Sequence, residues 1–442
     1  MNKKSLIVLM MLLFINFLLA PKEVLAENEA AIKVWLITDL HYLSPNLTDY
    51  GKRFEIFQRQ AAGIDYQYGP ERLGALLAQI EKEAPDYLII SGDLTSNGEY
   101  DSMVELASFF EQVEAVGTQV LVIPGNHDIH NGWAVRFEGK KTIKVKQTSP
   151  EDFVTLFGPF GYDEATTRDP NSLSYLAAIS DKWNLLMLDT NIYSETPGKG
   201  QSEGKGQLKP ETLTWINQVL SAAQTQNQFS LPVLHHPGIS HFTLLRTGNP
   251  VEAASEFQKL LVHYQIPLMA SGHLHTQHIA QAQVDDYTLN EVVTSSFSIY
   301  PGIIGEFMLQ EDKVDYQQIE LDMAAWFADK GTGHLTYEDY MAHLETLHRN
   351  STYIIVFDAL YNNEKLKEHT KEISEVFELL NISFFKGHIQ KDWEMLEPKL
   401  RAIEPLLEET DYRFFNGYLD LMLSTKDWSQ TELTVNWLNP SP

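Results

Sequence analysis

The 442-residue sequence contains no cysteine. Disulfides, zinc–thiolate sites, iron–sulfur clusters, a cysteine nucleophile and a lipid-modified N-terminal cysteine are therefore excluded. Positive charge is also scarce, because 33 basic residues face 60 acidic ones and leave a net charge of −27. A body this acidic repels polyanions, so we expect neither a nucleic-acid polymer nor an anionic membrane surface as a partner.

Long apolar runs are absent except at the N-terminus. There, two lysines precede an apolar stretch over residues 6–20, and Pro21 and Ala26 complete the pattern of a secretory signal peptide over residues 1–26. A membrane span needs about 20 apolar residues, and this run is shorter. An uncleaved anchor is the alternative. We therefore expect a secreted protein, extracellular or in the cell envelope, with no stable membrane span after cleavage.

Within an expected first domain over residues 27–321, short runs rich in Val, Ile and Leu alternate with amphipathic helical patterns from residue 32 to about 271. Three consecutive strands follow. The expected strands cover residues 32–38, 87–91, 120–124, 185–188, 231–234, 267–270, 291–299, 304–309 and 314–321. The expected helices between them cover residues 71–82, 100–116, 210–225 and 252–264. This alternation predicts a layered α/β domain.

The last part of the chain, residues 322–442, has a different pattern. It is expected to form an all-α C-terminal domain with helices over residues 337–347, 364–380, 392–407 and 411–423. Such a bundle could cover a site on the first domain, bind a partner or mediate a homo-oligomer. The pattern does not choose among these roles.

Polar side chains follow five of the expected strands directly. They are Asp39 and His41, Asp93, Asn126 and His127, His235, and His273 and His275. In open α/β sheets, ligands bind beyond the carboxyl ends of the strands, so these side chains should meet at one rim. Imidazole, carboxylate and amide groups bind divalent transition metals. Each cluster alone is compatible with an ordinary turn or a buried core histidine, but five in succession favour a metal site.

The five blocks LITDLH, SGDLTSNGEY, PGNHD, HHP and GHLH resemble the calcineurin-like metallophosphoesterase superfamily. They look closest to its class III cyclic-nucleotide phosphodiesterase and glycerophosphodiesterase branch, of the secreted bacterial type. The resemblance covers residues 32–321. It implies two mixed β-sheets sandwiched between helices, an αββα fold, with two metal ions at one end. Manganese and iron suit such a site best, and zinc is compatible with it.

The resemblance also assigns roles by position. The first metal would be held by Asp39, His41 and His275, the second by Asn126, His235 and His273, and both by Asp93. His127 would face the substrate as the catalytic residue, and His236 would lie outside the metal shell. Many relatives place an aspartate where this chain has Ser96, followed by Asn97, so the support of His127 is open. Asp128 either orients His127 or caps the following turn.

The activity that the resemblance implies is hydrolysis of 2′,3′- or 3′,5′-cyclic nucleotides or similar small phosphodiesters. Two cations neutralise the anionic diester, and a metal-bound hydroxide attacks phosphorus. A small anionic phosphodiester is therefore the expected partner. The alternatives are a phosphomonoesterase of the 5′-nucleotidase type and a catalytically inactive scaffold. The presence of His127 and all seven ligands disfavours the scaffold.

Overall fold

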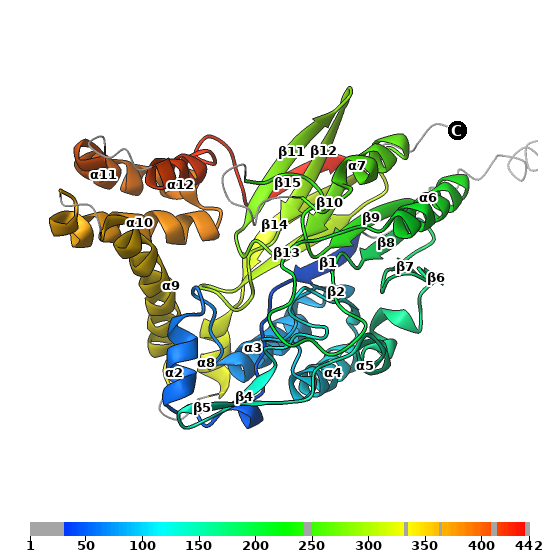
Figure 1. The fold of residues 1–442 in the computed structure, drawn as a ribbon. Helices are drawn as coiled ribbons and strands as arrows, with labels where there is room; N and C mark the ends of the chain where they lie inside the picture. The colour runs from blue at the N-terminus through cyan, green and yellow to red at the C-terminus, as the bar shows by residue number, and fades with distance from the viewer. Residues whose placement is uncertain (1–30, 243–249, 331–334, 362–364, 408–412, 438–442) are drawn as a thin grey trace, which may run out of the picture. The chain divides into compact units, whose positions relative to one another are not determined.

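The computed structural model describes residues 31–242, 250–330, 335–361, 365–407 and 413–437. The predicted signal peptide, residues 1–26, lies outside them. Figure 1 shows two mixed β-sheets with helices around them, followed by a series of helices near the C-terminus. The predicted fold class is thus confirmed: mixed sheets between helices, with a C-terminal helical region. Within the described residues we find no helix with the length and apolarity of a membrane span.

The first sheet has six strands in the order β15-β14-β13-β1-β2-β3. They are β1 (Ile32–Ile37), β2 (Tyr87–Ser91), β3 (Gln119–Ile123), β13 (Ile303–Leu309), β14 (Lys313–Glu320) and β15 (Glu432–Asn436). β1, β2 and β3 run parallel, with Leu36 opposite Ile89 and Ile89 opposite Leu121. Their carboxyl ends therefore lie at one edge of the sheet.

The second sheet has seven strands in the order β11-β12-β10-β9-β8-β7-β6. They are β6 (Thr167–Arg168), β7 (Tyr175–Ala178), β8 (Trp183–Leu188), β9 (Phe229–Leu234), β10 (Leu268–Ser271), β11 (His278–Val284) and β12 (Tyr287–Val293). β8, β9, β10 and β12 run parallel, and every residue of β8 and β9 is buried. Strands buried on both faces are continuous hydrophobic runs, which is how the sequence predicted them.

Helices connect the parallel strands and supply the outer layers. They are α2 (Lys52–Arg59), α3 (Gly69–Glu83), α4 (Tyr100–Ala115), α5 (Pro150–Leu156), α6 (Pro210–Thr225) and α7 (Ala254–His263). Three short turns, η1 (Pro45–Leu47), η2 (Gly158–Tyr162) and η4 (Lys367–His369), and the hairpin β4 (Val135–Glu138) and β5 (Lys141–Lys144) complete the connections. One apolar core includes residues of both large sheets, such as Trp35 of β1 and Leu186 of β8.

The C-terminal region consists of α8 (Met323–Lys330), α9 (Tyr337–Leu360), α10 (Thr370–Phe385), α11 (Ile389–Leu407) and α12 (Arg413–Leu423). Helices α9 to α12 share an apolar cluster with Phe242, Leu274 and Val293 of the α/β part. Contacts also cross the predicted boundary at residue 322, because α8 packs on α3 and β15 pairs with β14. The division into domains 27–321 and 322–442 stays a prediction.

Candidate metal centre

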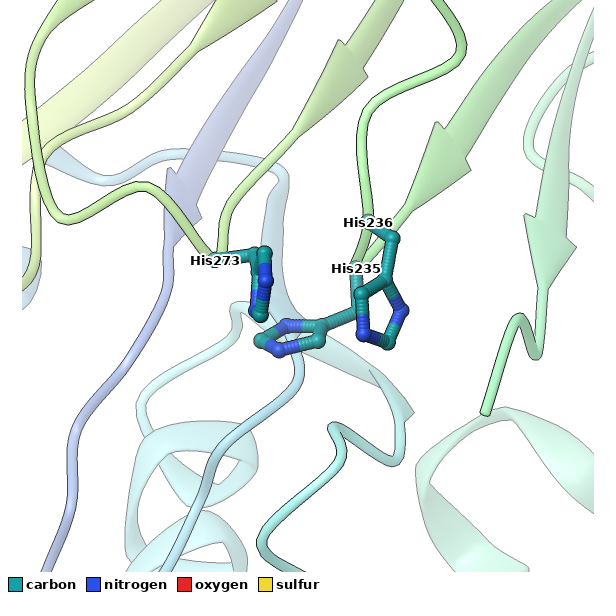
Figure 2. A group of neighbouring side chains, drawn as sticks. All are labelled: His235, His236 and His273. Carbon is teal, nitrogen blue, oxygen red and sulfur yellow. The ribbon is translucent and has the colours of Figure 1, made fainter. Parts of the chain in front are cut away.

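The predicted site residues all follow strand ends. Asp39, Asp93, Asn126, His235 and His273 lie within three residues of the last residue of β1, β2, β3, β9 and β10. The structure forms two groups of side chains, and within each group the ligand atoms lie within 4.8 Å of one another. The first group is Asp39, His41, Asp93 and His275, and the second is His235, His236 and His273. Figure 2 shows the second group, with its three imidazoles gathered from the ends of two strands.

In the first group, a carboxylate oxygen and two imidazole nitrogens lie close together. Nε2 of His275 lies 3.2 Å from Oδ1 of Asp39 and 3.1 Å from Nε2 of His41. Oδ1 of Asp39 is buried and accepts no well-aligned hydrogen bond among the described residues, so the His275 ring is its nearest partner. An unpaired buried carboxylate oxygen is costly unless a cation or donor satisfies it. This oxygen and the two imidazoles therefore fit a metal ion.

Asp93 lies between the two groups. Its Oδ2 is 3.8 Å from Nε2 of His41 and 3.4 Å from Nε2 of His235. Its Oδ1 accepts a hydrogen bond of 2.8 Å from the backbone N–H of His127. One carboxylate oxygen thus faces histidines of both groups, which is the arrangement that a bridging ligand requires.

In the second group, a backbone carbonyl orients the central histidine. Nδ1 of His235 donates to the carbonyl oxygen of Ser91 at 2.8 Å, which leaves Nε2 facing Oδ1 of Asn126 at 3.1 Å. Hydrogen bonds of this kind fix the tautomer of metal-binding histidines. The ring of His273 lies 5.1 Å from that of His235. Nitrogen and amide oxygen donors without thiolate fit manganese, iron or zinc.

His236, predicted to lie outside the metal shell, has a ring nitrogen within 4.8 Å of ring nitrogens of His235 and His273. Nδ1 of His236 hydrogen-bonds to Oγ1 of Thr190 at 2.9 Å, and its buried Nε2 has no partner among the described residues. Its ring centroid is 4.4 Å from that of His273. The doubled histidine in HHP was the available signal, but the sequence does not show which way the second ring turns.

Five residues of the site adopt the left-handed backbone conformation, which residues other than glycine rarely adopt. The positive φ angles are 52° at Asp39, 44° at His41, 48° at Asp93, 68° at His273 and 58° at His275. Non-glycine residues in this region cluster at functional sites, where the surrounding structure enforces them. Here the enforcement includes hydrogen bonds from the N–H of Asp39 to the carbonyl of Gly92 and from the N–H of His41 to that of Asp93.

Two glycines make room for these loops. Gly92 has a φ of 101°, and a Cβ there would lie 2.5 Å from Nδ1 of His235. A Cβ on Gly272 would lie 1.9 Å from Oγ1 of Thr38. Any side chain at either position would displace a ligand loop, which explains the glycines in the SGD and GHLH blocks.

Electrostatics favour the ligand forms of most of these groups. Burial lowers the pKa values of His41 and His273 to about 3 each, so both imidazoles are neutral at pH 7. Burial alone would raise the pKa of Asp39, but His275 holds it below its usual value. Burial opposes the charge on His235, but Asp93 outweighs it and raises the His235 pKa to about 9. A cation at His235 therefore displaces a proton at neutral pH.

His127 stands beside the two groups, its ring 5.0 Å from that of His41. Its Nδ1 lies 2.7 Å from the backbone carbonyl oxygen of Ser96. A carbonyl only accepts, so Nδ1 carries the proton and Nε2 is free to exchange another. The support that the sequence left open thus comes from the main chain of Ser96, and Asn97 contacts the Ser96 hydroxyl instead.

Asp128 neither contacts the His127 ring nor caps a helix. Its carboxylate accepts hydrogen bonds from the backbone N–H groups of Leu94 and Thr95, both at 3.0 Å, and of Gly125 at 2.7 Å. It therefore ties the loop after β2 to the loop after β3. Those loops carry Asp93, Asn126 and His127.

The fold and the polar side chains at the strand ends define the class of the protein. The chain belongs to the calcineurin-like phosphoesterase family, whose model matches residues 32–277. A curated relative, a probable cyclic nucleotide phosphodiesterase of Synechococcus sp., is 25% identical over 209 residues, which are 47% of this chain and 65% of that relative. The match therefore spans less than two thirds of the relative's length.

Two solved structures are similar to this chain at low sequence identity. A dimetal phosphatase from Danio rerio is 12% identical, with 66% of this chain and 99% of that chain covered and a TM-score of 0.45. A purple acid phosphatase from yellow lupin (Lupinus luteus) seeds is 11% identical, with 70% and 55% covered and a TM-score of 0.42.

Proposed function

We propose that this protein is a dinuclear-metal phosphodiesterase that hydrolyses small diesters such as cyclic nucleotides. The observation that carries the proposal is the position of Asp93, whose Oδ2 faces His41 at 3.8 Å and His235 at 3.4 Å. The probable cyclic nucleotide phosphodiesterase among the relatives supports the choice of a diester.

Each group would hold one metal. We assign the first to Asp39, His41 and His275, the second to Asn126, His235 and His273, and the shared position to Asp93. Held by these residues, two cations would neutralise the charge of an anionic diester and activate a water as the nucleophile. Manganese and iron are the proposed ions, and zinc also fits these donors.

The chain's own contribution to bond cleavage is the proton on His127. The leaving alkoxide needs a proton, and a general acid that supplies it raises the reaction rate by about 10²–10⁴-fold. The carbonyl of Ser96 holds Nδ1, so the ring presents Nε2 to the leaving oxygen. The hydrogen bond from the His127 N–H to Asp93 keeps the same residue in register with the metal ligands.

We also propose that the protein acts outside the cytoplasm. The lysines, apolar stretch and Ala26 of residues 1–26 support export. An exported enzyme of this kind would act on extracellular nucleotides or on phosphodiesters of the envelope. Fractionation of cells that express the full chain, followed by N-terminal sequencing, tests this proposal. A mature protein in the cytoplasmic fraction that still begins at Met1 would refute it.

The test compares manganese-dependent hydrolysis of bis(p-nitrophenyl) phosphate and p-nitrophenyl phosphate by residues 27–442. We expect the diester to be hydrolysed faster than the monoester, and we expect chelator to abolish both activities. A surface control, His369→Ala, should keep the diester preference. A monoester preference would move the assignment to a phosphatase or nucleotidase. No turnover of either ester with metal bound would indicate a scaffold.

A further inference from the structure

A buried carboxylate on β12 gathers donors from two different loops. Glu291 is fully buried. Its carboxylate accepts hydrogen bonds from the backbone N–H groups of Gly238 and Ile239, both at 2.8 Å, and from Oγ of Ser271 at 2.7 Å. Nε2 of His241 lies 3.2 Å from Oε2 of the same carboxylate.

Both loops carry a residue assigned to the second metal. Gly238 follows His235 by three residues, and Ser271 precedes His273 by two. The two loops also meet directly, because the N–H of Gly272 donates to the carbonyl of His235 at 3.0 Å. Glu291 therefore binds to both sides of this junction.

The first group of ligands is held by other residues. The carbonyl of Asp39 accepts hydrogen bonds from the hydroxyls of Ser296 at 2.8 Å and Ser298 at 3.0 Å. Its Oδ2 accepts from Thr38 at 2.8 Å. None of these contacts involves Glu291. The loop of His273 does reach the first group, because the N–H of His273 donates to Oδ2 of Asp39 at 2.9 Å and His275 follows on the same loop. A change in the Glu291 carboxylate should therefore act more strongly on the second position than on the first.

We propose that Glu291 is a positioning residue that holds the loops of His235 and His273 together and thereby sets the affinity of the second metal position. The inference rests on the dinuclear centre proposed above. The N–H and O–H donors around this buried side chain need two accepting oxygens, which a carboxylate provides. In Glu291→Gln one oxygen becomes an NH2 group, which faces N–H and O–H donors and cannot accept from them. The junction must then open or rotate.

The affinity change has an expected size. Loss of a residue that orients metal ligands costs about 10–100-fold in metal affinity. We expect a loss of this order at the second position in Glu291→Gln, and a smaller loss at the first. The matched control is Glu306→Gln, because Glu306 is a buried glutamate of β13 that binds Nε1 of Trp35 at 2.8 Å and contacts no ligand loop.

The experiment is a Mn²⁺ titration of the full chain followed by electron paramagnetic resonance. The wild type and Glu306→Gln should develop the signal of an exchange-coupled manganese pair. Glu291→Gln should show the six-line signal of isolated Mn²⁺ at the same metal concentration and develop the coupled signal only at higher concentration. Equal weakening of both positions, or an unchanged titration, would overturn the inference.

Two further results separate the inference from the proposal on which it rests. If the wild type binds only one Mn²⁺, the dinuclear centre and the role of Glu291 both fail. If the wild type binds a pair and Glu291→Gln does too with unchanged affinity, only the role of Glu291 fails. Should Glu291→Gln not fold, Ser271→Ala removes one donor on the His273 side. It should weaken the second position in the same direction, and an unchanged titration would again overturn the inference.

Discussion

Replacement of His127 by alanine isolates the proton donor from the metal ligands. The side chain loses its hydrogen bond to the carbonyl of Ser96, but the backbone N–H that binds Oδ1 of Asp93 at 2.8 Å remains. The ring is partly exposed, so the lost hydrogen bond should cost about 1 kcal/mol of unfolding free energy. His127→Ala should therefore fold and bind metal as the wild type does.

When the leaving group is an alkoxide, His127→Ala should lose the whole rate acceleration that a general acid provides. General acids contribute about 10²–10⁴-fold, which corresponds to about 2.7–5.4 kcal/mol of transition-state stabilisation. A nitrophenolate leaves without a proton, so its diester should lose far less. The assay measures kcat for His127→Ala on bis(p-nitrophenyl) phosphate and on whichever cyclic nucleotide the wild type hydrolyses, at matched manganese content.

The ratio of the two losses decides the role of His127. A loss that is larger for the cyclic nucleotide by tenfold or more, about 1.4 kcal/mol, supports a proton donor. Equal losses on both substrates would refute proton donation and indicate that His127 binds the phosphoryl group instead. No loss on either would remove His127 from the reaction.

Three further predictions concern the surroundings of the centre. Leu274→Ala, within the α9–α12 cluster, should lower the free energy of unfolding in urea by about 2–4 kcal/mol and also weaken manganese binding. Leu380→Ala in the same cluster should lower the free energy of unfolding only. Equal losses of manganese affinity in the two variants would refute this difference. Gly92→Ala should abolish binding at His235, measured as bound metal per chain, because its Cβ would lie 2.5 Å from Nδ1 of that ring; wild-type metal content would contradict the packing argument. Burial lowers the pKa of His348 to about 4, so the folded state keeps it neutral and the unfolded state protonates it near 6.5. The free energy of unfolding should therefore be highest above pH 6.5 and fall by about 3 kcal/mol as the pH drops toward 4, because the unfolded state then binds the proton. A flatter pH profile of urea unfolding in His348→Gln would confirm this.

The sequence predicted the centre of the fold because its strands are buried on both faces. β2 and α6 have the predicted bounds, and β1, β3 and β9 differ by one or two residues. The predicted strand over residues 291–299 was wrong in its second half: β12 ends at Val293, and the chain turns so that Ser296 and Ser298 can bind the carbonyl of Asp39. Apolar periodicity does not distinguish a strand from a buried loop of this kind.

The missed elements share a different cause. β15 is a short edge strand, separated from its neighbour β14 by 111 residues of the chain, and its alternating pattern resembles an exposed loop. The hairpin β4–β5 is largely exposed and carries no apolar run. Pairings of this kind depend on tertiary contacts, which a local pattern does not contain.

The sequence predicted which side chains gather at the strand ends, but not what holds them in place. The five blocks predicted that Asp39 through His275 meet there, and the structure brings these side chains together, while their roles as ligands stay a prediction. The carbonyl of Ser96, the inward turn of His236 and the carboxylate of Glu291 did not follow from the sequence. Each of these depends on which atom faces which in the folded chain, and a backbone carbonyl leaves no signature in the residue type at all.

The position of the metals tests the central claim most directly. Crystals grown with Mn²⁺ and measured at the manganese absorption edge would locate each ion by its anomalous signal. The proposed centre predicts two peaks about 3.5–4 Å apart, one at Asp39, His41 and His275, the other at His235 and His273, with Asp93 between them. A single peak, or two peaks that Asp93 does not join, would contradict the dinuclear mechanism.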